Sequence, residues 1–130
     1  IFTDHMYECD FENDEWQTPI IRPYQALSID PSAKVFHYGQ AVFEGMKAYR
    51  DDNDDIWLFR PDQNKGRLTI SQKRLDMLAL PKTLFFEGLR HLWKMEIDGL
   101  AISRKVMYFL KQMNQNFSRN GSSKNMMSQI

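Results

Sequence analysis

The chain has 130 residues, of which 42% are hydrophobic, and its 17 basic side chains balance 17 acidic ones. This length and apolar share are typical of one globular domain, and a zero net charge gives no overall attraction to nucleic acid or to an anionic membrane. No apolar run approaches the roughly 18 residues of a membrane span, and the polar first residues do not resemble a signal peptide. We therefore expect a soluble, cytoplasmic protein with no nucleic-acid or membrane partner.

The cysteine and histidine content argues against a metal site. Cys9 is the single cysteine, which excludes an internal disulfide and a cysteine-rich zinc site. The histidines at 5, 37 and 91 do not have the spacing of a metal-binding motif such as HExxH. We predict that no metal is bound.

The first elements in chain order are predicted to form a hairpin. Polar and apolar residues roughly alternate over 5–11, a turn-rich stretch follows over 12–15, and apolar residues resume over 16–24. Because Pro19 and Pro23 interrupt the second half, we expect it to be an edge strand.

A second hairpin is predicted over 46–59. Two apolar runs, 46–50 and 56–59, flank the sequence Asp51-Asp52-Asn53-Asp54-Asp55. Five acidic or amide side chains in a row cannot be buried, so this segment is expected to be a solvated turn. A calcium loop would need the wider ligand spacing and the distant glutamate of an EF-hand.

Two amphipathic helices are predicted next. Pro61 suits the first position of a helix, and a stripe with helical spacing extends to about Met77. Its members are Leu68, Ser71, Leu75 and Leu78. A second helix is expected after Pro81, with an apolar stripe made of Leu84, Phe85, Leu89, Leu92 and Trp93. Both stripes predict core faces, so the fold class is α+β, with a mostly antiparallel sheet and two packed helices.

The sequence changes character beyond about Asp98. The stretch 106–113 predicts a short helix, whereas 114–130 is rich in Asn, Ser, Gln and Lys without periodicity. Such a composition buries too little apolar surface to offset the entropy of ordering. We therefore expect a folded unit over 1–98 and a poorly ordered tail over 99–130.

The run KVFHYGQAVFEGMKAYR, residues 34–50, combines aromatic, polar and glycine residues. Glycine at 39 and 45 permits a positive φ or a close approach to the backbone. Tyr38 and Phe43 would then line an apolar wall with one hydroxyl group, as in a small-ligand pocket. On the residues alone, aromatic core residues with turn glycines are the favoured explanation of the run, ahead of a pocket.

Three blocks carry a resemblance to a known family: FTDHM at 2–6, LSIDPSAKVFHYGQAVFEGMKAYR at 27–50 and LFRPDQNKGRL at 58–68. In order and spacing they resemble the branched-chain amino-acid aminotransferases, which are fold-type-IV pyridoxal-phosphate enzymes. The resemblance runs to about Asp98 and implies an incomplete small N-terminal domain, followed by a divergent segment. It also implies pyridoxal 5'-phosphate as cofactor, a homodimer or larger assembly, and amino-group exchange between leucine, isoleucine or valine and 2-oxoglutarate.

The resemblance also implies roles for individual residues. Tyr38 and Phe43 match positions that face the aliphatic side chain of the substrate, and Gly45 matches a position lining the same pocket. Arg67 matches the arginine that binds the cofactor phosphate. A guanidinium suits this role because its planar donors hold two phosphate oxygens at once and it never loses its charge.

No lysine of this chain matches the lysine that forms the Schiff base with the cofactor, which in the family lies well beyond residue 130. We therefore assign no catalytic residue here and expect the chain to be inactive alone. Two alternatives remain open. One is a non-catalytic interaction or dimerisation fragment, and the other is a different fold-type-IV enzyme, such as a D-amino-acid aminotransferase or an aminodeoxychorismate lyase.

Overall fold

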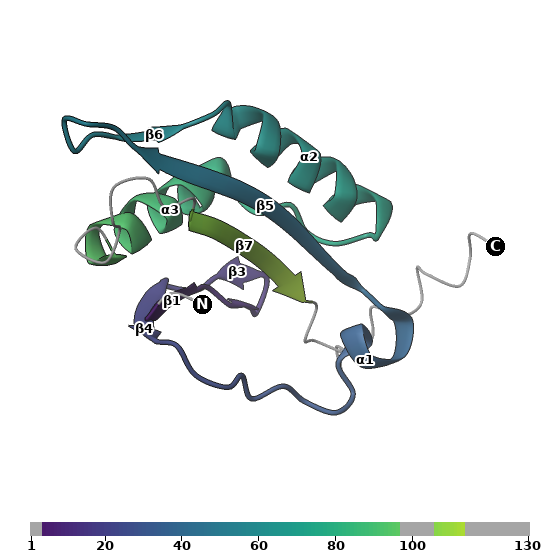
Figure 1. Ribbon diagram of the computed structural model, residues 1–130. Helices are drawn as coiled ribbons and strands as arrows, with labels where there is room; N and C mark the ends of the chain where they lie inside the picture. The colour runs from purple at the N-terminus through teal and green to yellow at the C-terminus, as the bar shows by residue number, and fades with distance from the viewer. Residues whose placement is uncertain (1–3, 97–105, 114–130) are drawn as a thin grey trace.

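A computed structural model describes residues 4–96 and 106–113 of the chain (Figure 1). The elements in chain order are β1 (His5–Glu8), β2 (Phe11–Glu12), β3 (Glu15–Trp16), β4 (Ile20–Pro23), α1 (Lys34–Tyr38), β5 (Ala41–Arg50), β6 (Ile56–Leu58), α2 (Pro61–Arg74), α3 (Lys82–Glu96) and β7 (Val106–Met113). All strand pairs among the described residues are antiparallel, which confirms the α+β prediction. In the same part of the chain, no helix has the length and apolar character needed to cross a membrane.

The predicted N-terminal hairpin is confirmed, in two segments. β1 pairs with β4, from His5 opposite Pro23 to Glu8 opposite Ile20, and β2 pairs with β3 at the tip. Pro19 lies in the break between β3 and β4, where it costs no ladder hydrogen bond. The prolines therefore shape this hairpin without preventing it.

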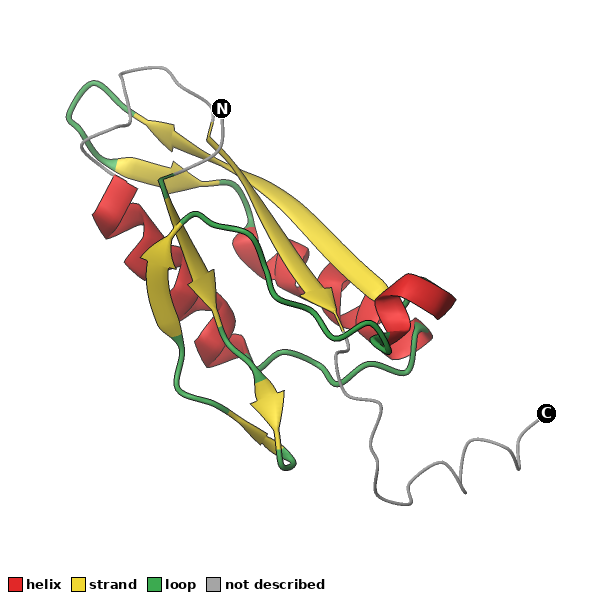
Figure 2. Cartoon of the chain, turned by 90° about the horizontal axis from the view of Figure 1, so that it is seen from below, coloured by secondary structure: helices red, strands yellow, loops and turns green. Residues whose placement is uncertain are grey.

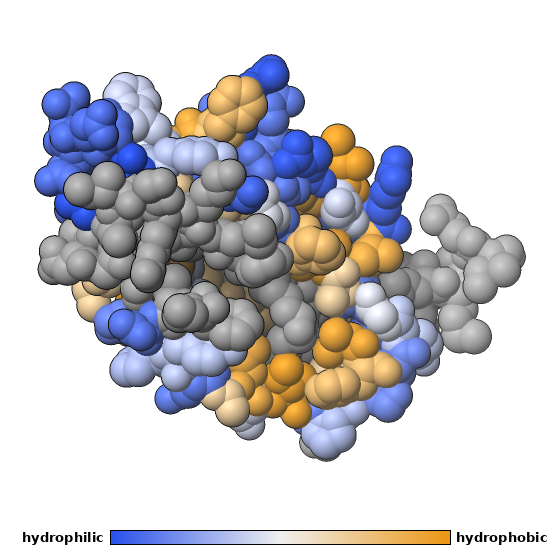
Figure 3. Space-filling model, viewed as in Figure 1, coloured by the Kyte–Doolittle hydropathy of each residue, from blue (hydrophilic) through white to orange (hydrophobic). Residues whose placement is uncertain are grey.

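β5 is the central strand of the other sheet (Figure 1). It pairs with β6 over residues 48–50 and with β7 over residues 41–48. Asp51 stabilises the acidic turn by accepting the N–H groups of Asn53 and Asp55, both at 2.9 Å. Figure 3 shows the turn as a hydrophilic projection at the upper left. Because β6 is short, the described residues contain no strand alongside 41–47 on that edge of β5.

The prediction of a short helix over 106–113 is wrong, because this segment is strand β7. Its first residues, Val-Met-Tyr-Phe, include β-branched and aromatic types that favour strands. Pairing along nearly the whole of β5 gives hydrogen-bond partners to the backbone groups of β7 that face β5, and this long-range pairing outweighs local helix propensity. The remainder of the predicted tail, 99–105 and 114–130, lies outside the described residues.

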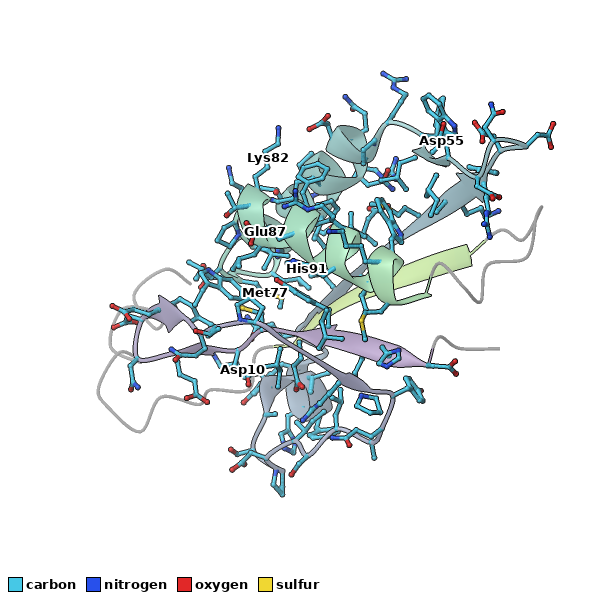
Figure 4. All side chains as sticks on the ribbon, turned by 90° about the vertical axis from the view of Figure 1, so that its left-hand side faces the viewer. Asp10, Asp55, Met77, Lys82, Glu87 and His91 are labelled. Atoms are coloured by element: carbon cyan, nitrogen blue, oxygen red, sulfur yellow. The ribbon has the colours of Figure 1, made fainter. Side chains whose placement is uncertain are left out.

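The core lies between β5 and the two long helices. Its buried members are Val42, Met46, Ala48, Leu68, Met77, Phe85 and Leu89. α2 packs along β5 and α3 packs against β1, an arrangement that Figure 2 shows from below. Figure 4 labels Lys82, Glu87 and His91 along α3; Lys82 and His91 are exposed, whereas Glu87 is half-buried.

The apolar stripe predicted for α2 is confirmed only in part. Leu68 is 2% exposed, but Leu75 and Leu78 are 39% and 50% exposed. The reason is that α2 ends at Arg74 and the chain turns at Asp76, whose φ is 51°. Leu75 is the first residue after the helix and Leu78 lies beyond the turn, so neither follows the helical repeat and their spacing does not place them in the core.

One close contact joins β1 to α3. A Cβ atom built on Gly88 would lie 2.7 Å from Cε1 of Tyr7 and 2.9 Å from its Cδ1. A Cβ on Gly66, which is also inside a helix, would meet no atom within 4 Å. Gly88 is thus required by packing, whereas nothing in the described structure requires glycine at position 66.

We predict opposite effects of alanine at these two helix positions. Replacing a helix-interior glycine gains about 0.5–1 kcal/mol in helix propensity, whereas overpacking costs about 1–3 kcal/mol. Gly66→Ala should therefore stabilise the protein by about 0.5–1 kcal/mol, and Gly88→Ala should destabilise it by about 1–2 kcal/mol. Urea unfolding followed by circular dichroism measures both. A Gly88→Ala variant as stable as Gly66→Ala would contradict the Tyr7 contact.

Candidate functional site

A hollow of about 410 Å³ lies where α2 begins, next to the part of β5 that β6 does not cover. It is lined by Gly45, Met46, Lys47, Tyr49, Phe59, Arg60, Gln63, Asn64 and Arg67. A long strand beside a short one thus leaves a recess, and the first turns of α2 form its other wall.

The structure brings together two of the four residues that the sequence singled out. Gly45 and Arg67 line the same hollow. Phe43 lies on β5, two residues before Gly45, and Tyr38 is the last residue of α1, at the opposite end of β5 from β6 (Figure 1). Their side chains are 69% and 77% exposed, respectively, and neither lines the hollow.

The two glycines of the 34–50 run differ in conformation. Gly39 has a φ of 60° and ends α1 in the left-handed region, as glycine commonly does after a helix. Gly45 lies inside strand β5, and a Cβ atom built on it would meet no atom within 4 Å. Its missing side chain therefore leaves open space in the hollow.

The lining of the hollow is cationic. Lys47, Arg60 and Arg67 all contribute to it, and none of the acidic side chains in the described ranges does. Arg60 precedes α2 with left-handed backbone angles, φ 48° and ψ 53°, which are uncommon for a residue with a side chain. Such a concentration of positive charge in a recess favours an anionic ligand.

Glu44 is the residue on which this site depends and that the sequence reasoning missed. Side chains alternate along a strand, so Glu44 faces the same side of β5 as the buried Val42 and Met46. Its side chain is only 11% exposed. A carboxylate in such a place requires charged or hydrogen-bonding partners.

Those partners come from α2. Arg67 donates to both oxygens of Glu44, from Nη2 to Oε1 at 2.7 Å and from Nε to Oε2 at 3.3 Å. Asn64 donates from Nδ2 to Oε1 at 2.8 Å and to the carbonyl oxygen of Gly45 at 3.1 Å. Because positions 64 and 67 are one helical turn apart, both side chains reach the same carboxylate.

These contacts set the ionisation of the pair. Burial acts to raise the pKa of Glu44, but the hydrogen bonds from Arg67 and Asn64 and the charge of Arg67 outweigh it, so the pKa lies below its ordinary value. The hydrogen bonds to Glu44 and its charge raise the pKa of Arg67 in turn. Both groups are therefore charged at neutral pH, and the Arg67 side chain remains 62% exposed on its outer side.

The geometry suits a phosphate or carboxylate group. Of the five N–H groups of Arg67, Glu44 accepts one from Nε and one from Nη2. Both N–H groups of Nη1 and the second one of Nη2 are therefore left for an anion with two or more oxygens. Among residues 4–96 and 106–113, no group of His, Cys, Asp and Glu side chains could hold a metal ion. The donors of Arg67 can hold two oxygens of one phosphate group.

Comparison with known proteins finds aminotransferases whose sequences are similar to that of the chain. No family model matches it. It is 51% identical over 111 residues to branched-chain-amino-acid transaminase 1 of Bacillus subtilis, and 46% identical over 112 residues to branched-chain-amino-acid aminotransferase 2 of the same organism. It is also 52% identical over 75 residues to the cytosolic branched-chain-amino-acid aminotransferase of Saccharomyces cerevisiae. The chain is therefore a relative of the branched-chain aminotransferases, as the motifs indicated.

These matches cover most of this chain but only a small part of each relative. The Bacillus matches cover 85% of this chain but 31% of each relative, and the yeast match covers 57% of this chain and 20% of the relative. The chain thus spans less than a third of the length of these relatives. A match of 111 residues is also longer than the stretch that ends at Asp98, so the similarity continues past the point where the motifs stop.

The Glu44–Arg67 pair predicts how stability depends on pH. Because folding lowers the pKa of Glu44 below its ordinary value of 4.5, the pair stabilises the fold above that pH and the contribution is lost as pH falls through the folded-state pKa. Glu44→Gln should cost about 1–2 kcal/mol at pH 7, and this difference from wild type should shrink below about pH 4.5. Urea unfolding at several pH values measures it. A difference that stays constant down to about pH 3 would contradict the ionised pair.

Proposed function

We propose that this chain supplies the phosphate-binding arginine and part of the substrate wall of a pyridoxal-phosphate-dependent branched-chain aminotransferase. The reaction is the exchange of an amino group between leucine, isoleucine or valine and 2-oxoglutarate. The observation that carries the proposal is the position of Arg67. It is the residue that the family motif marks, and it lies exposed in a cationic hollow beside Gly45.

Each lining residue has a physical role in this proposal. Arg67 binds the phosphate through its outer donors, while Lys47 and Arg60 add positive potential around it. Gly45 leaves space against the strand backbone. When bound, pyridoxal phosphate supplies the electron sink that amino-group exchange requires.

The substrate wall is the second part of the proposal. Phe43 and Tyr38 present largely exposed aromatic rings, and we assign them to contact with the aliphatic side chain of the amino acid. They do not form a closed pocket with Arg67 among the described residues. We infer that in a protein as long as the relatives, further residues cover them and complete the pocket.

The remaining parts of the proposal concern the Schiff-base lysine and the domain to which this chain corresponds. The Schiff-base lysine matches no lysine of this chain by motif, so we assign it to the part of the relatives that these 130 residues do not match. Residues 1–98 correspond in this proposal to the small domain of the enzyme, which works as a homodimer or larger assembly.

A chimeric enzyme tests the proposal. Residues 4–96 of this chain replace the matching segment of branched-chain-amino-acid transaminase 1 of Bacillus subtilis, to which the chain is 51% identical. We expect glutamate formation from leucine and 2-oxoglutarate. Arg67→Ala in the chimera should weaken cofactor binding about tenfold or more, since a charge-assisted bidentate contact is lost. Equilibrium dialysis and a coupled glutamate assay measure the two effects.

The matched control is Arg90→Ala, which removes an exposed arginine of α3 that does not line the hollow. It should leave cofactor affinity unchanged. An active chimera whose cofactor affinity does not change on Arg67→Ala would contradict the phosphate role. A correctly folded chimera that binds the cofactor but acts only on D-amino acids would contradict the branched-chain assignment.

A further inference from the structure

Glu44 is a charged residue on the core-facing side of β5, and its neighbours on that side are apolar. Val42 and Met46, two positions before and after it, are 6% and 7% exposed. An apolar side chain at position 44 would extend this stripe without any need for partners. The cost of desolvating a carboxylate here therefore calls for an explanation other than packing.

Asn64 of α2 fixes the Glu44 carboxylate relative to the backbone of β5. Asn64, which is 7% exposed, donates both to Glu44 Oε1 and to the carbonyl oxygen of Gly45. Asn64 thus ties the acid to its own strand as well as to the helix. Glu44 has little freedom to move, and its oxygens form a fixed acceptor pair.

The fixed acceptor pair in turn orients Arg67. A single hydrogen bond would leave the guanidinium free to rotate, but contacts through Nε and Nη2 to two different oxygens define its plane. An arginine that is 62% exposed would otherwise sample many rotamers, and a ligand would have to order it on binding. With Glu44 in place, the outer edge of the guanidinium stays directed away from the carboxylate.

We propose that Glu44, braced by Asn64, is a positioning residue that holds the Arg67 guanidinium ready for a phosphate monoester in the hollow. This inference rests on the proposed function, since it presumes that Arg67 binds the cofactor phosphate. It assigns Glu44 no contact with the ligand. The carboxylate acts only through Arg67, by removing rotamer freedom before the anion arrives.

The positioning role and a simple charge effect predict opposite changes in anion affinity when Glu44 is replaced. Removing a negative charge beside the hollow should tighten the binding of an anion if only electrostatics mattered. Removing the residue that orders Arg67 should weaken binding, by about twofold to tenfold, which corresponds to the ordering of one long side chain. The two interpretations therefore predict opposite directions for the same variant.

The test titrates the 130-residue chain with pyridoxine 5'-phosphate at about 0.15 M salt. A parallel titration uses pyridoxine, which lacks the phosphate. Binding is followed by ³¹P and proton NMR. The phosphorylated probe has no aldehyde, so it cannot form adducts with lysines. We expect Glu44→Ala to weaken its binding about twofold to tenfold and Glu44→Gln, which keeps one acceptor oxygen, to weaken it less. Binding of pyridoxine should not change. Glu12→Gln, a loss of one exposed negative charge at the hairpin tip, is the matched control and should leave both affinities unchanged.

A second readout reports on Arg67 itself. Its Nε–H signal should exchange slowly with water in the wild type and faster in Glu44→Ala, because the acceptor at Oε2 is gone. Circular dichroism identifies any variant that fails to fold, in which case Glu44→Gln provides the comparison. Equal or tighter binding of the phosphorylated probe by folded Glu44 variants would overturn the positioning role.

The outcomes also separate this inference from the proposed function. If Arg67→Ala weakens the binding of pyridoxine 5'-phosphate but the Glu44 variants do not, only the positioning role is wrong. If Arg67→Ala binds the phosphorylated probe as well as the wild type does, the phosphate role of Arg67 is wrong and the inference fails with it.

Discussion

The contact between one half-buried carboxylate and one arginine connects the fold of this protein to its site. Glu44 reaches α2 from the core-facing side of β5. Arg67 and Asn64 of α2 donate hydrogen bonds to its carboxylate. The same contacts that satisfy a desolvated charge also join the central strand to the helix that packs along it. A single interaction therefore serves packing and presents a cation to the recess at the strand edge.

The recess itself follows from unequal strand lengths. β5 has ten residues and β6 has three, so the chain leaves β6 early and enters α2 at Pro61. The first turns of α2 then lie across an uncovered stretch of β5, and Lys47 and Arg60 are among the residues that line the recess. Polar backbone and cationic side chains remain accessible there, whereas β7 pairs with the other edge of the strand. The position of the hollow is thus a consequence of sheet topology.

Local patterns in the sequence were sufficient to predict both hairpins, the two long helices and the α+β class. Alternation, the acidic run after Arg50 and the proline at position 61 each have a direct local cause. Strand β7 was missed because its partner is more than fifty residues away in sequence, and such long-range pairing outweighs local propensity. Leu75 and Leu78 were misplaced because a helical repeat does not show where the helix ends.

The site could be predicted only in part for a related reason. Motif resemblance pointed to Arg67 and Gly45, which share the hollow. It could not show that Arg67 pairs with Glu44, although a signal was present: Glu44 occupies a core-facing register position between Val42 and Met46, where an acidic residue needs a partner. Tyr38 and Phe43 were expected in the same pocket as Gly45, but neither lines the hollow.

The most direct test of the account is the nitrogen–proton NMR spectrum of the chain with pyridoxine 5'-phosphate and, separately, with pyridoxine. The account predicts that the phosphorylated probe shifts the Arg67 Nε–H and Gly45 amide signals, while pyridoxine shifts neither. The signals of exposed cations on α3, such as Lys82 and Arg90, should stay in place with both probes. Shifts that are equal for the two probes, or that fall on α3 and leave Arg67 unchanged, would contradict the claim that this hollow is a phosphate site.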